Sequence, residues 1–212
     1  MKYEAILFDL DGVICSTDKY HYQAWKAIAD ELGIYFDEKI NDRLRGVSRM
    51  ASFEIILEKY EGTMSQEEKE TWVTKKNDLY KELLKNMSEK DLSKEVKDTL
   101  DQLRAQGILL AIGSSSRNAR FILGQLGLGD YFDAISDGNN ITHSKPDPEV
   151  FLKAAAFVDR QPEKCLVVED AKAGVEAAKR GNMDCAFIGK EEDRSQEDYR
   201  IHTFKELLEV VK

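Results

Sequence analysis

The stretch of sequence that decides the fold is Tyr3 to Val13, which reads YEAILFDLDGV. It begins as a short apolar run with aromatic and β-branched residues and ends at Asp11-Gly12, a pattern typical of a buried parallel strand followed by a turn. Ligands of open parallel sheets bind beyond the carboxyl ends of the strands, where this sequence places Asp9 and Asp11. We therefore expect both acids at a functional site, although DxDG taken alone also fits a solvated turn.

The spacing of these two acids suggests a chemistry. Two carboxylates this close repel when both are ionised, so a divalent cation or a shared proton must intervene. A hard cation would keep Asp9 ionised as a nucleophile and would let Asp11 exchange a proton.

Alternation of strands and helices continues in the second half of the chain. Strands are expected at Ile108 to Gly113, Ala134 to Ser136, Cys165 to Asp170 and Asp184 to Gly189. Helices are expected between them, at Glu95 to Gln106, Pro148 to Val158 and Lys172 to Arg180. This order predicts βαβ units, hence an α/β fold with a Rossmann-like parallel sheet core and helices on both faces.

The segment from about Thr17 to Ser93 interrupts the alternation with three amphipathic helices and no convincing strand. The helices are expected at Asp18 to Leu32, Arg49 to Tyr60 and Gln66 to about Met87. The second follows Ser48 as N-cap, and the third begins with a capping box of Ser65 and Glu68. We therefore expect an inserted α-helical cap domain at 16–93 and a catalytic core made of 1–15 and 94–212.

Three other predicted strands end in residues that could join Asp9. Ser114 to Ser116 could bind a phosphate oxygen ahead of a helix starting near Arg117, although such a loop is more often an N-cap. Lys145, held out of the helical region by the following proline, could be a fixed charge or a solvated lysine. Glu169 and Asp170 could be metal ligands or acids at a helix N-terminus. Together they would place a nucleophile, a hydroxyl, a lysine and a metal-binding acid on one rim, which suits phosphoryl transfer.

Composition excludes several classes of function. The 212 residues carry 31 Lys and Arg against 40 Asp and Glu, a net charge of -9, which makes nucleic acid an unsuitable partner. A hydrophobic content of 42% allows a core to form. No apolar run reaches the roughly 18 residues of a membrane span and no signal peptide is evident, so we expect a cytoplasmic protein without membrane contact. The three cysteines lack CxxC spacing, which indicates free thiols.

These motifs resemble the haloacid dehalogenase superfamily of aspartate-nucleophile phosphotransferases, in the order DxDGV, Ser114, Lys145-Pro146 and Glu169-Asp170. The chain resembles the β-phosphoglucomutase family of that superfamily more closely, over essentially its whole length. The segments that carry this resemblance are YHYQAW (Tyr20 to Trp25), LRGVSR (Leu44 to Arg49), KKND (Lys75 to Asp78), SSSRN (Ser114 to Asn118), YFDAI (Tyr131 to Ile135), SKPDPEVF (Ser144 to Phe151) and EDAKAG (Glu169 to Gly174).

The resemblance implies catalytic roles in the core. Asp9 would be the nucleophile that becomes an aspartyl phosphate, and Asp11 the general acid and base. Ser114 and Lys145 would bind the transferring phosphoryl group. Mg²⁺ would be held by Asp9, the backbone carbonyl of Asp11, and Asp170 with Glu169 near it.

The resemblance also implies a sugar site. Arg49 in the cap would bind the second phosphate, with Ser115, Ser116, Arg117 and Asn118 across a cleft. The sugar would be lined by cap residues: His21, Trp25, Arg45, Gly46, Val47, Ser52 and Lys76. Without the resemblance, Lys76 could be a snorkelling lysine between Trp72 and Tyr80, and His21 a surface or cap residue. Two positions depart from the family pattern: Arg45 stands where Lys is usual, and Ser16 where an acid is common.

The expected activity is interconversion of β-D-glucose 1-phosphate and D-glucose 6-phosphate through a β-glucose 1,6-bisphosphate intermediate, by a monomeric enzyme. A mutase must exclude water and bind two anionic ends, and the sequence offers positive groups for both. The nearest alternative is a sugar-phosphate phosphatase with the same core. A phosphoaspartate receiver module is disfavoured, because that module has no helical insert and needs no acid two positions after its nucleophile.

Overall fold

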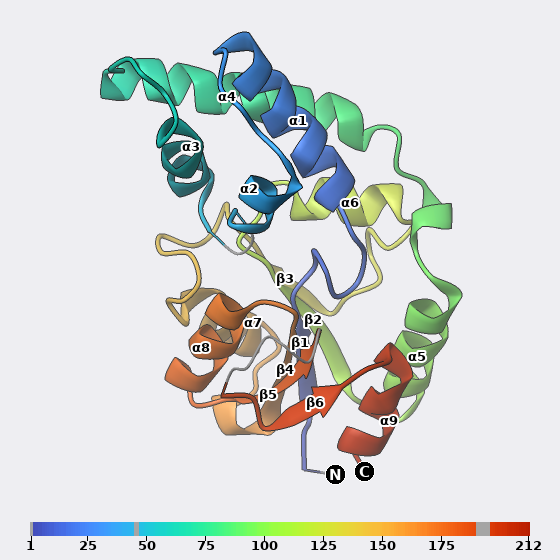
Figure 1. Cartoon of the computed structure of the whole chain (residues 1–212). Coiled ribbons are helices and arrows are strands. Elements are labelled where there is room, and N and C mark those ends of the chain that lie inside the picture. Colours follow the sequence, from blue (N-terminus) through green and yellow to red (C-terminus); the bar gives the residue numbers. More distant parts are fainter. Residues whose placement is uncertain (1, 45–46, 190–195) are drawn as a thin grey trace. The chain divides into compact units, whose positions relative to one another are not determined.

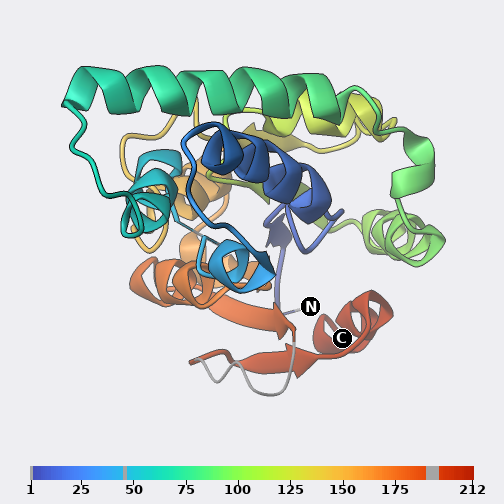
Figure 2. The ribbon, with the colours of Figure 1, turned by 45° about the horizontal axis from the view of Figure 1, so that its top comes forward.

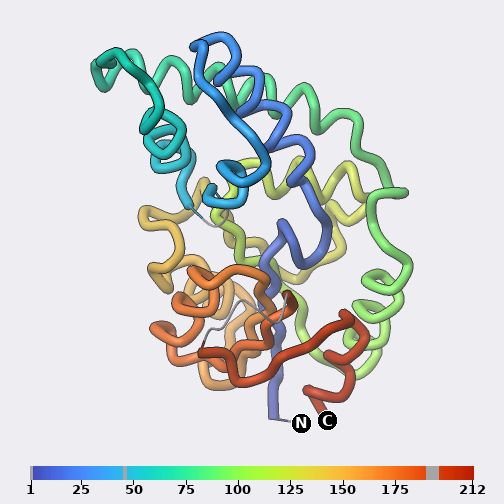
Figure 3. Tube along the Cα trace, viewed as in Figure 1, coloured from blue at the N-terminus to red at the C-terminus, as the bar shows by residue number. Residues whose placement is uncertain are grey.

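The computed structural model describes residues 2–44, 47–189 and 196–212, which form two compact units. The larger contains the residues up to Ser16 and Ser88–Lys212, and the smaller is Thr17–Met87. The sequence places the cap at 16–93, whereas Ser16 and the stretch 88–93, with its 3₁₀ turn Glu89–Asp91, belong to the larger unit. Figure 3 traces how the chain leaves this unit after the first strand and later returns to it.

The larger unit is built on a parallel sheet of six strands in the order β3-β2-β1-β4-β5-β6 (Figure 1). The α/β class predicted from the sequence is therefore confirmed. The strands are β1 Ala5–Phe8, β2 Leu109–Gly113, β3 Ala134–Ser136, β4 Cys165–Glu169, β5 Asp184–Ile188 and β6 Tyr199–Ile201. The four residues of β1 are all fully buried, as expected for the centre of a parallel sheet.

Helices cover both faces of this sheet (Figure 1). On one face, α7 (Glu149–Phe157) and α8 (Lys172–Arg180) pack with apolar side chains such as Phe151 and Val175 against Leu7 and Val167. The opposite face carries α5 (Lys94–Ala105) and α9 (Leu207–Val210). There the ring of Phe8 stacks on Phe204, 5.7 Å between centroids. The unit also contains helix α6, Ala119–Gln125, and the 3₁₀ turns Pro162–Lys164 and Phe204–Glu206.

The smaller unit is helical. Its helices are α1 Asp18–Glu31, α2 Glu38–Asp42, α3 Arg49–Leu57 and α4 Gln66–Leu84. Figure 2 shows α1, in dark blue, lying along the long helix α4, in green. The predicted caps are present: Ser48 accepts the N–H of Ala51, and Ser65 and Glu68 form a capping box.

Among the described elements, α2, α9 and β6 were not predicted from the sequence, and α2 and β6 have a clear physical reason. Helix α2 buries only Asn41 and has no apolar periodicity, but the side chain of Asp37 accepts the N–H of Ile40 and starts it. Strand β6 is an edge strand of three residues, too short to show an alternating pattern in the sequence. In addition, α3 ends at Leu57 rather than Tyr60, and α4 at Leu84 rather than Met87.

All three cysteines are buried and free, and burial raises the pKa of each thiol, so they remain protonated. Among the described residues, no helix is both long enough and apolar enough to cross a bilayer.

Candidate active site

The carboxyl ends of three neighbouring strands carry the predicted core residues. Because β1 lies between β2 and β4, and Phe8 pairs with Ile112 and Val168, the residues after these positions are level with one another. Asp9 follows β1, Ser114 follows β2 and Glu169 ends β4. The sheet therefore brings together residues that are up to 160 positions apart in the sequence.

Lys145 binds two of these carboxylates. Its Nζ donates to Asp9 Oδ1 and, over 2.6 Å, to Glu169 Oε1, and all three residues are buried. Burial would lower the pKa of Lys145, but the charges of Asp9 and Glu169 outweigh it and raise that pKa, so the ammonium stays charged. Lys145 is thus a fixed cation within bonding distance of the proposed nucleophile.

Asp170 adds another carboxyl group to this cluster, and Lys145 offsets the rise in its pKa only in part. Burial first, and then the charges of Glu169, Asp9 and Asp11, raise the pKa of Asp170 to about 8. Glu169 is raised in pKa by its burial as well, although Lys145 opposes this shift. The cluster therefore holds more negative charge than Lys145 compensates.

Two glycines allow the acids to approach the backbone. A Cβ on Gly12, which has a φ of +93°, would lie 2.0 Å from Asp170 Oδ2. A Cβ on Gly174 would lie 1.8 Å from Glu169 Oε1. The backbone N–H groups of Asp170 and Ala171 also donate to Glu169 Oε2, at 2.9 and 3.0 Å. Sequence reasoning had assigned these glycines no role of their own.

Residues 114–118, called the serine loop below, connect β2 to α6. Ser114 is buried, Ser115 and Ser116 are half-buried, and Arg117 is exposed. Ser114 Oγ accepts the N–H of Ser116 over 3.2 Å, and Ser116 Oγ accepts the N–H of Asn118 over 3.1 Å. The hydroxyls shape the loop as acceptors, and each keeps an O–H that could donate to a ligand.

The acid-rich cluster fits a hard divalent cation. Carboxylate and carbonyl oxygens are the ligands Mg²⁺ prefers, and the raised pKa of Asp170 shows that an added positive charge would be stabilised there. Within the described ranges, the one trio with ligand atoms all within 4.8 Å is elsewhere: His143, Asp147 and Glu149. In that trio Glu149 already accepts the N–H groups of Thr142 and His143 and pairs with Lys153, as residues at a helix start do.

In the smaller unit, Lys76 is the most unusual of the predicted residues. It is only 1% exposed, and its Nζ lies 4.8 Å from the ring centroid of Trp25 and 4.5 Å from that of Tyr80. The sequence placed Lys76 between Trp72 and Tyr80, but the ring of Trp72 faces Lys75. Trp25 of α1 takes its place, so Lys76 is a buried cation enclosed by aromatic rings from two helices.

His21 lies beside this lysine. Its Nδ1 is 2.9 Å from Lys76 Nζ, and its ring stacks on Tyr80 at 4.1 Å. Burial first, and then the charges of Lys76 and Arg49, hold the pKa of His21 well below its usual range, so the imidazole is neutral at pH 7. The hydroxyl of Tyr80 donates to Thr17 Oγ1 over 3.0 Å. Sequence reasoning missed this supporting role of Tyr80 and Thr17, since it depends on a contact between residues 63 positions apart.

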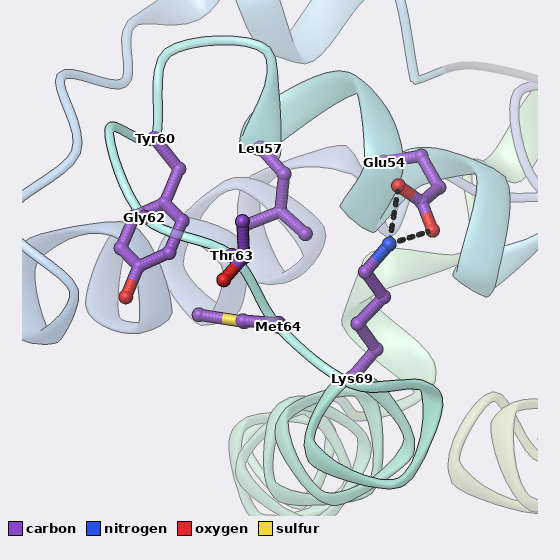
Figure 4. Close-up of a pocket in the computed structure, with 7 residues that line it drawn as sticks. All are labelled: Glu54, Leu57, Tyr60, Gly62, Thr63, Met64 and Lys69. Carbon is purple, nitrogen blue, oxygen red and sulfur yellow. Dashed lines mark hydrogen bonds and ion pairs between the residues drawn. The ribbon is translucent and has the colours of Figure 1, made fainter.

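The other predicted cap residues differ in placement. Ser52 is buried, Arg49 is half-buried at the start of α3, and Val47 is exposed. Arg45 and Gly46 lie outside the described residues. Figure 4 shows a pocket elsewhere in the smaller unit, crossed at one end by the ion pair of Lys69 with Glu54. None of the predicted site residues lines that pocket.

Comparisons with known proteins identify the family to which the chain belongs. The model of the haloacid dehalogenase-like hydrolase family matches residues 3–182. The chain is 41% identical to the β-phosphoglucomutase of Bacillus subtilis over 88% of this chain and 84% of that protein. It is 33% identical to the phosphorylated carbohydrates phosphatase of Thermotoga maritima, over 85% and 82% of the two chains. The crystal structure of a β-phosphoglucomutase from Clostridium difficile superimposes with a TM-score of 0.91 at 35% identity, covering 99% of this chain and 95% of that one. Fold, strand-end residues and sequence similarity thus agree that this chain belongs to the haloacid dehalogenase-like hydrolase family.

Proposed function

We propose that the chain is a phosphomutase that interconverts β-D-glucose 1-phosphate and D-glucose 6-phosphate through an aspartyl phosphate. The observation that carries the proposal is the buried Lys145, which binds both Asp9 and Glu169 at the ends of β1 and β4, beside the end of β2, which Ser114 follows. A carboxylate nucleophile beside a fixed cation suits phosphoryl transfer, in which positioning and charge neutralisation supply most of the catalysis. The similarity to two β-phosphoglucomutases supports the choice of sugar.

In the first half-reaction, phosphorylated Asp9 gives its phosphoryl group to O6 of β-glucose 1-phosphate. The bond from phosphorus to the Asp9 oxygen breaks, a bond to O6 forms, and the O6 proton passes to the Asp11 carboxylate. The product is β-glucose 1,6-bisphosphate. Lys145 stabilises the charge that returns to Asp9.

In the second half-reaction, the bisphosphate is bound the other way round. The Asp9 carboxylate attacks the phosphorus on O1, the bond from phosphorus to O1 breaks, and Asp11 returns its proton to O1. Glucose 6-phosphate leaves, and Asp9 is again phosphorylated. No water is consumed, so the enzyme must keep water from the aspartyl phosphate.

Mg²⁺ would be held by Asp9, the backbone carbonyl of Asp11, and Asp170, with Glu169 beside them. When bound, it neutralises charge on the transferring phosphoryl group. Support for this set comes from the raised pKa of Asp170, because a cation would offset the repulsion among the acids.

The cap residues are proposed to select the sugar. Arg49, with Ser116, Arg117 and Asn118 of the serine loop, would bind the second phosphate. His21, Trp25 and Lys76 would contact the sugar, and the enclosure of Lys76 by aromatic rings supports this role, since sugars pack on aromatic faces and bind charged donors. The same assignment includes four more residues: Arg45, Gly46, Val47 and Ser52. We further expect a cytoplasmic monomer.

A sugar-phosphate phosphatase is the second candidate, supported by the similarity to the phosphatase of Thermotoga maritima. The two activities differ in whether water reaches the aspartyl phosphate. Pure β-glucose 1-phosphate, with a trace of the 1,6-bisphosphate and Mg²⁺, should be converted to glucose 6-phosphate with little free phosphate. Both products are measured in one sample, with α-glucose 1-phosphate as the control substrate. Free phosphate as the main product would support the phosphatase and exclude the mutase.

A further inference from the structure

A tight turn follows β3, and none of the proposed roles uses it. It consists of Asp137, Gly138, Asn139 and Asn140, and we call it the clamp turn. Its own side chains brace it: the N–H of Asp137 donates to Asn140 Oδ1 over 2.6 Å, and the N–H of Asn139 donates to Asp137 Oδ1 over 2.9 Å. Asn140 Nδ2 also donates to Ser136 Oγ over 3.1 Å. The turn therefore has a defined shape before any ligand binds.

The clamp turn holds two consecutive peptide groups of the serine loop. The N–H of Gly138 donates to the carbonyl of Ser116 over 3.1 Å. The side-chain amide of Asn139 donates to the carbonyl of Arg117 over 2.9 Å. Both contacts join segments about 22 residues apart, and they continue the pairing of β2 with β3 past its end.

Because each peptide group is planar, these two contacts fix the directions in which N–H groups of the serine loop point. The carbonyl of Ser116 and the N–H of Arg117 belong to one planar group and point in opposite directions, so Gly138 fixes where the Arg117 N–H points. In the next peptide, Ser116 Oγ holds the N–H of Asn118 while Asn139 holds the carbonyl of Arg117. Among the described residues, the N–H groups of Ser115 and Arg117 donate to no protein acceptor, so they are available to an anion.

Only a residue without a side chain fits at position 138. A Cβ on Gly138 would lie 2.5 Å from the carbonyl oxygen of Ser115 and 2.9 Å from the nitrogen of Arg117, closer than real Cβ contacts. Both are backbone atoms, which cannot swing aside as a flexible side chain can. A larger residue would have to displace the serine loop itself.

The clamp turn is in turn anchored to the rigid part of the unit. Lys153 of α7 donates from Nζ to the carbonyl of Asn140, and α7 packs on β2 and β3. The serine loop is thus fixed to the sheet at its start and to the clamp turn at its middle.

From this geometry we infer that Gly138 and Asn139 are positioning residues for phosphate binding. They act through the serine loop by presetting its N–H groups and do not touch the phosphate themselves. The inference rests on the proposed function, because it requires that the serine loop binds phosphate.

The test is calorimetric titration of the full chain with inorganic phosphate in the presence of Mg²⁺. Asn139→Ala and Gly138→Ala should each weaken phosphate binding about tenfold, because the loop loses its preset shape. Asn139→Asp should weaken it at least as much, since a carboxylate cannot donate to the Arg117 carbonyl. The melting temperature is recorded for every variant, so that a loss of folding is separated from a loss of binding.

Matched controls exist in the same unit. Gln102→Ala removes an exposed side-chain amide that donates to a backbone carbonyl, that of Asp98, over 3.1 Å. Gly124→Ala places a Cβ where no atom lies within 4 Å. Both controls should bind phosphate as the wild type does, and Ser114→Ala should bind it more weakly.

The outcomes separate the inference from the function beneath it. If the wild type binds phosphate in a Ser114-dependent way but Asn139→Ala and Gly138→Ala match their controls, the clamp turn has no positioning role. The inference would also be overturned if the clamp-turn variants lost phosphate binding only because they lost folding, as their melting temperatures would show, and if Gln102→Ala lost binding in the same way. If the wild type shows no Ser114-dependent phosphate binding, the proposed function and the inference both fail.

Discussion

Among the described residues, each unit of the molecule buries one lysine, and the two lysines have different surroundings. Lys145 in the larger unit is 8% exposed and binds the carboxylates of Asp9 and Glu169. Lys76 in the smaller unit is 1% exposed, and its ammonium lies over two aromatic rings and beside the neutral His21. One charge is neutralised by acids, and the other is accommodated by polarisable rings and an imidazole.

The different surroundings of Lys145 and Lys76 indicate different roles for the two lysines. Without Lys145, two buried acids would have no cation to neutralise them. Lys145 therefore contributes both to the stability of the fold and to the charge balance of the acid cluster. Aromatic rings and a neutral imidazole need no cation to remain buried. This difference supports the proposed role of Lys76 in binding the sugar.

The largest expected effect is that of Asp9→Asn, which removes the proposed nucleophile from the side of Lys145. Turnover should fall by more than about 10⁴-fold, since an amide forms no acyl phosphate at a useful rate. The fold should persist, because Lys145 keeps its bond to Glu169. Variant and wild type are compared by the rate at which they form glucose 6-phosphate from β-glucose 1-phosphate, with circular dichroism as the folding check. Activity within about tenfold of wild type would rule out Asp9 as nucleophile.

Lys145→Met tests how much the ion pairs of Lys145 with Asp9 and Glu169 contribute to activity and stability. It should abolish most activity and lower the free energy of unfolding by roughly 3–5 kcal/mol at pH 8, because two buried carboxylates lose their cation. Burial raises the pKa of Glu169, and the variant removes the charge of Lys145 that opposes this shift. The native variant then binds more protons than the unfolded chain, so the deficit should shrink as the pH falls toward 5. Denaturant titrations at both pH values measure this. A deficit that grows at pH 5 would mean that the ion pairs are not the cause.

Lys76→Met is the matched change in the smaller unit. The methionine keeps the contact with the rings of Trp25 and Tyr80, and the neutral His21 needs no cation. The free energy of unfolding should change by less than about 1 kcal/mol, while the KM for β-glucose 1-phosphate rises about tenfold. Denaturation and steady-state kinetics on one preparation decide this. A stability loss as large as that of Lys145→Met would remove the contrast between the two lysines.

The smallest effect concerns Mg²⁺ and pH. Asp170, with a pKa raised to about 8, is largely protonated at pH 6 in the absence of a cation, so a cation must then displace a proton. Mg²⁺ should therefore raise the melting temperature by a few degrees at pH 8.5 and by less at pH 6. Scans with and without the ion at both pH values measure it, and Asp170→Asn should remove most of the shift. An equal or larger shift at pH 6 would contradict the role of Asp170.

The core site could be predicted from the sequence because the carboxyl ends of adjacent parallel strands always meet at one edge. Once β1, β2 and β4 are recognised, Asp9, Ser114 and Glu169 must lie near one another, whatever the details of packing. The proline after Lys145 made that lysine a candidate, but its bonds to two acids could be read only from the structure.

Other features depend on contacts that no local pattern encodes. One of the two rings over Lys76 belongs to Trp25 on another helix. Spacing along α4 alone predicts Trp72 at that place, but Trp72 lies beside Lys75. The clamp turn resembles any Gly-Asn-rich loop until its contacts with the serine loop are seen. Strand β6 was missed because its pairing with β5, and not its composition, makes it a strand.

The most direct test of the central claim is to locate the phosphoryl group on the enzyme during turnover. The protein is mixed with β-glucose 1,6-bisphosphate and Mg²⁺, quenched in acid within the first turnovers, digested, and mapped by mass spectrometry. The account predicts one phosphorylated site, Asp9, which is absent in Asp9→Asn and which passes its phosphoryl group to β-glucose 1-phosphate when that acceptor is added, giving β-glucose 1,6-bisphosphate. A phosphoryl group on Asp11 or Ser114, or rapid turnover with no phosphorylated enzyme, would contradict it.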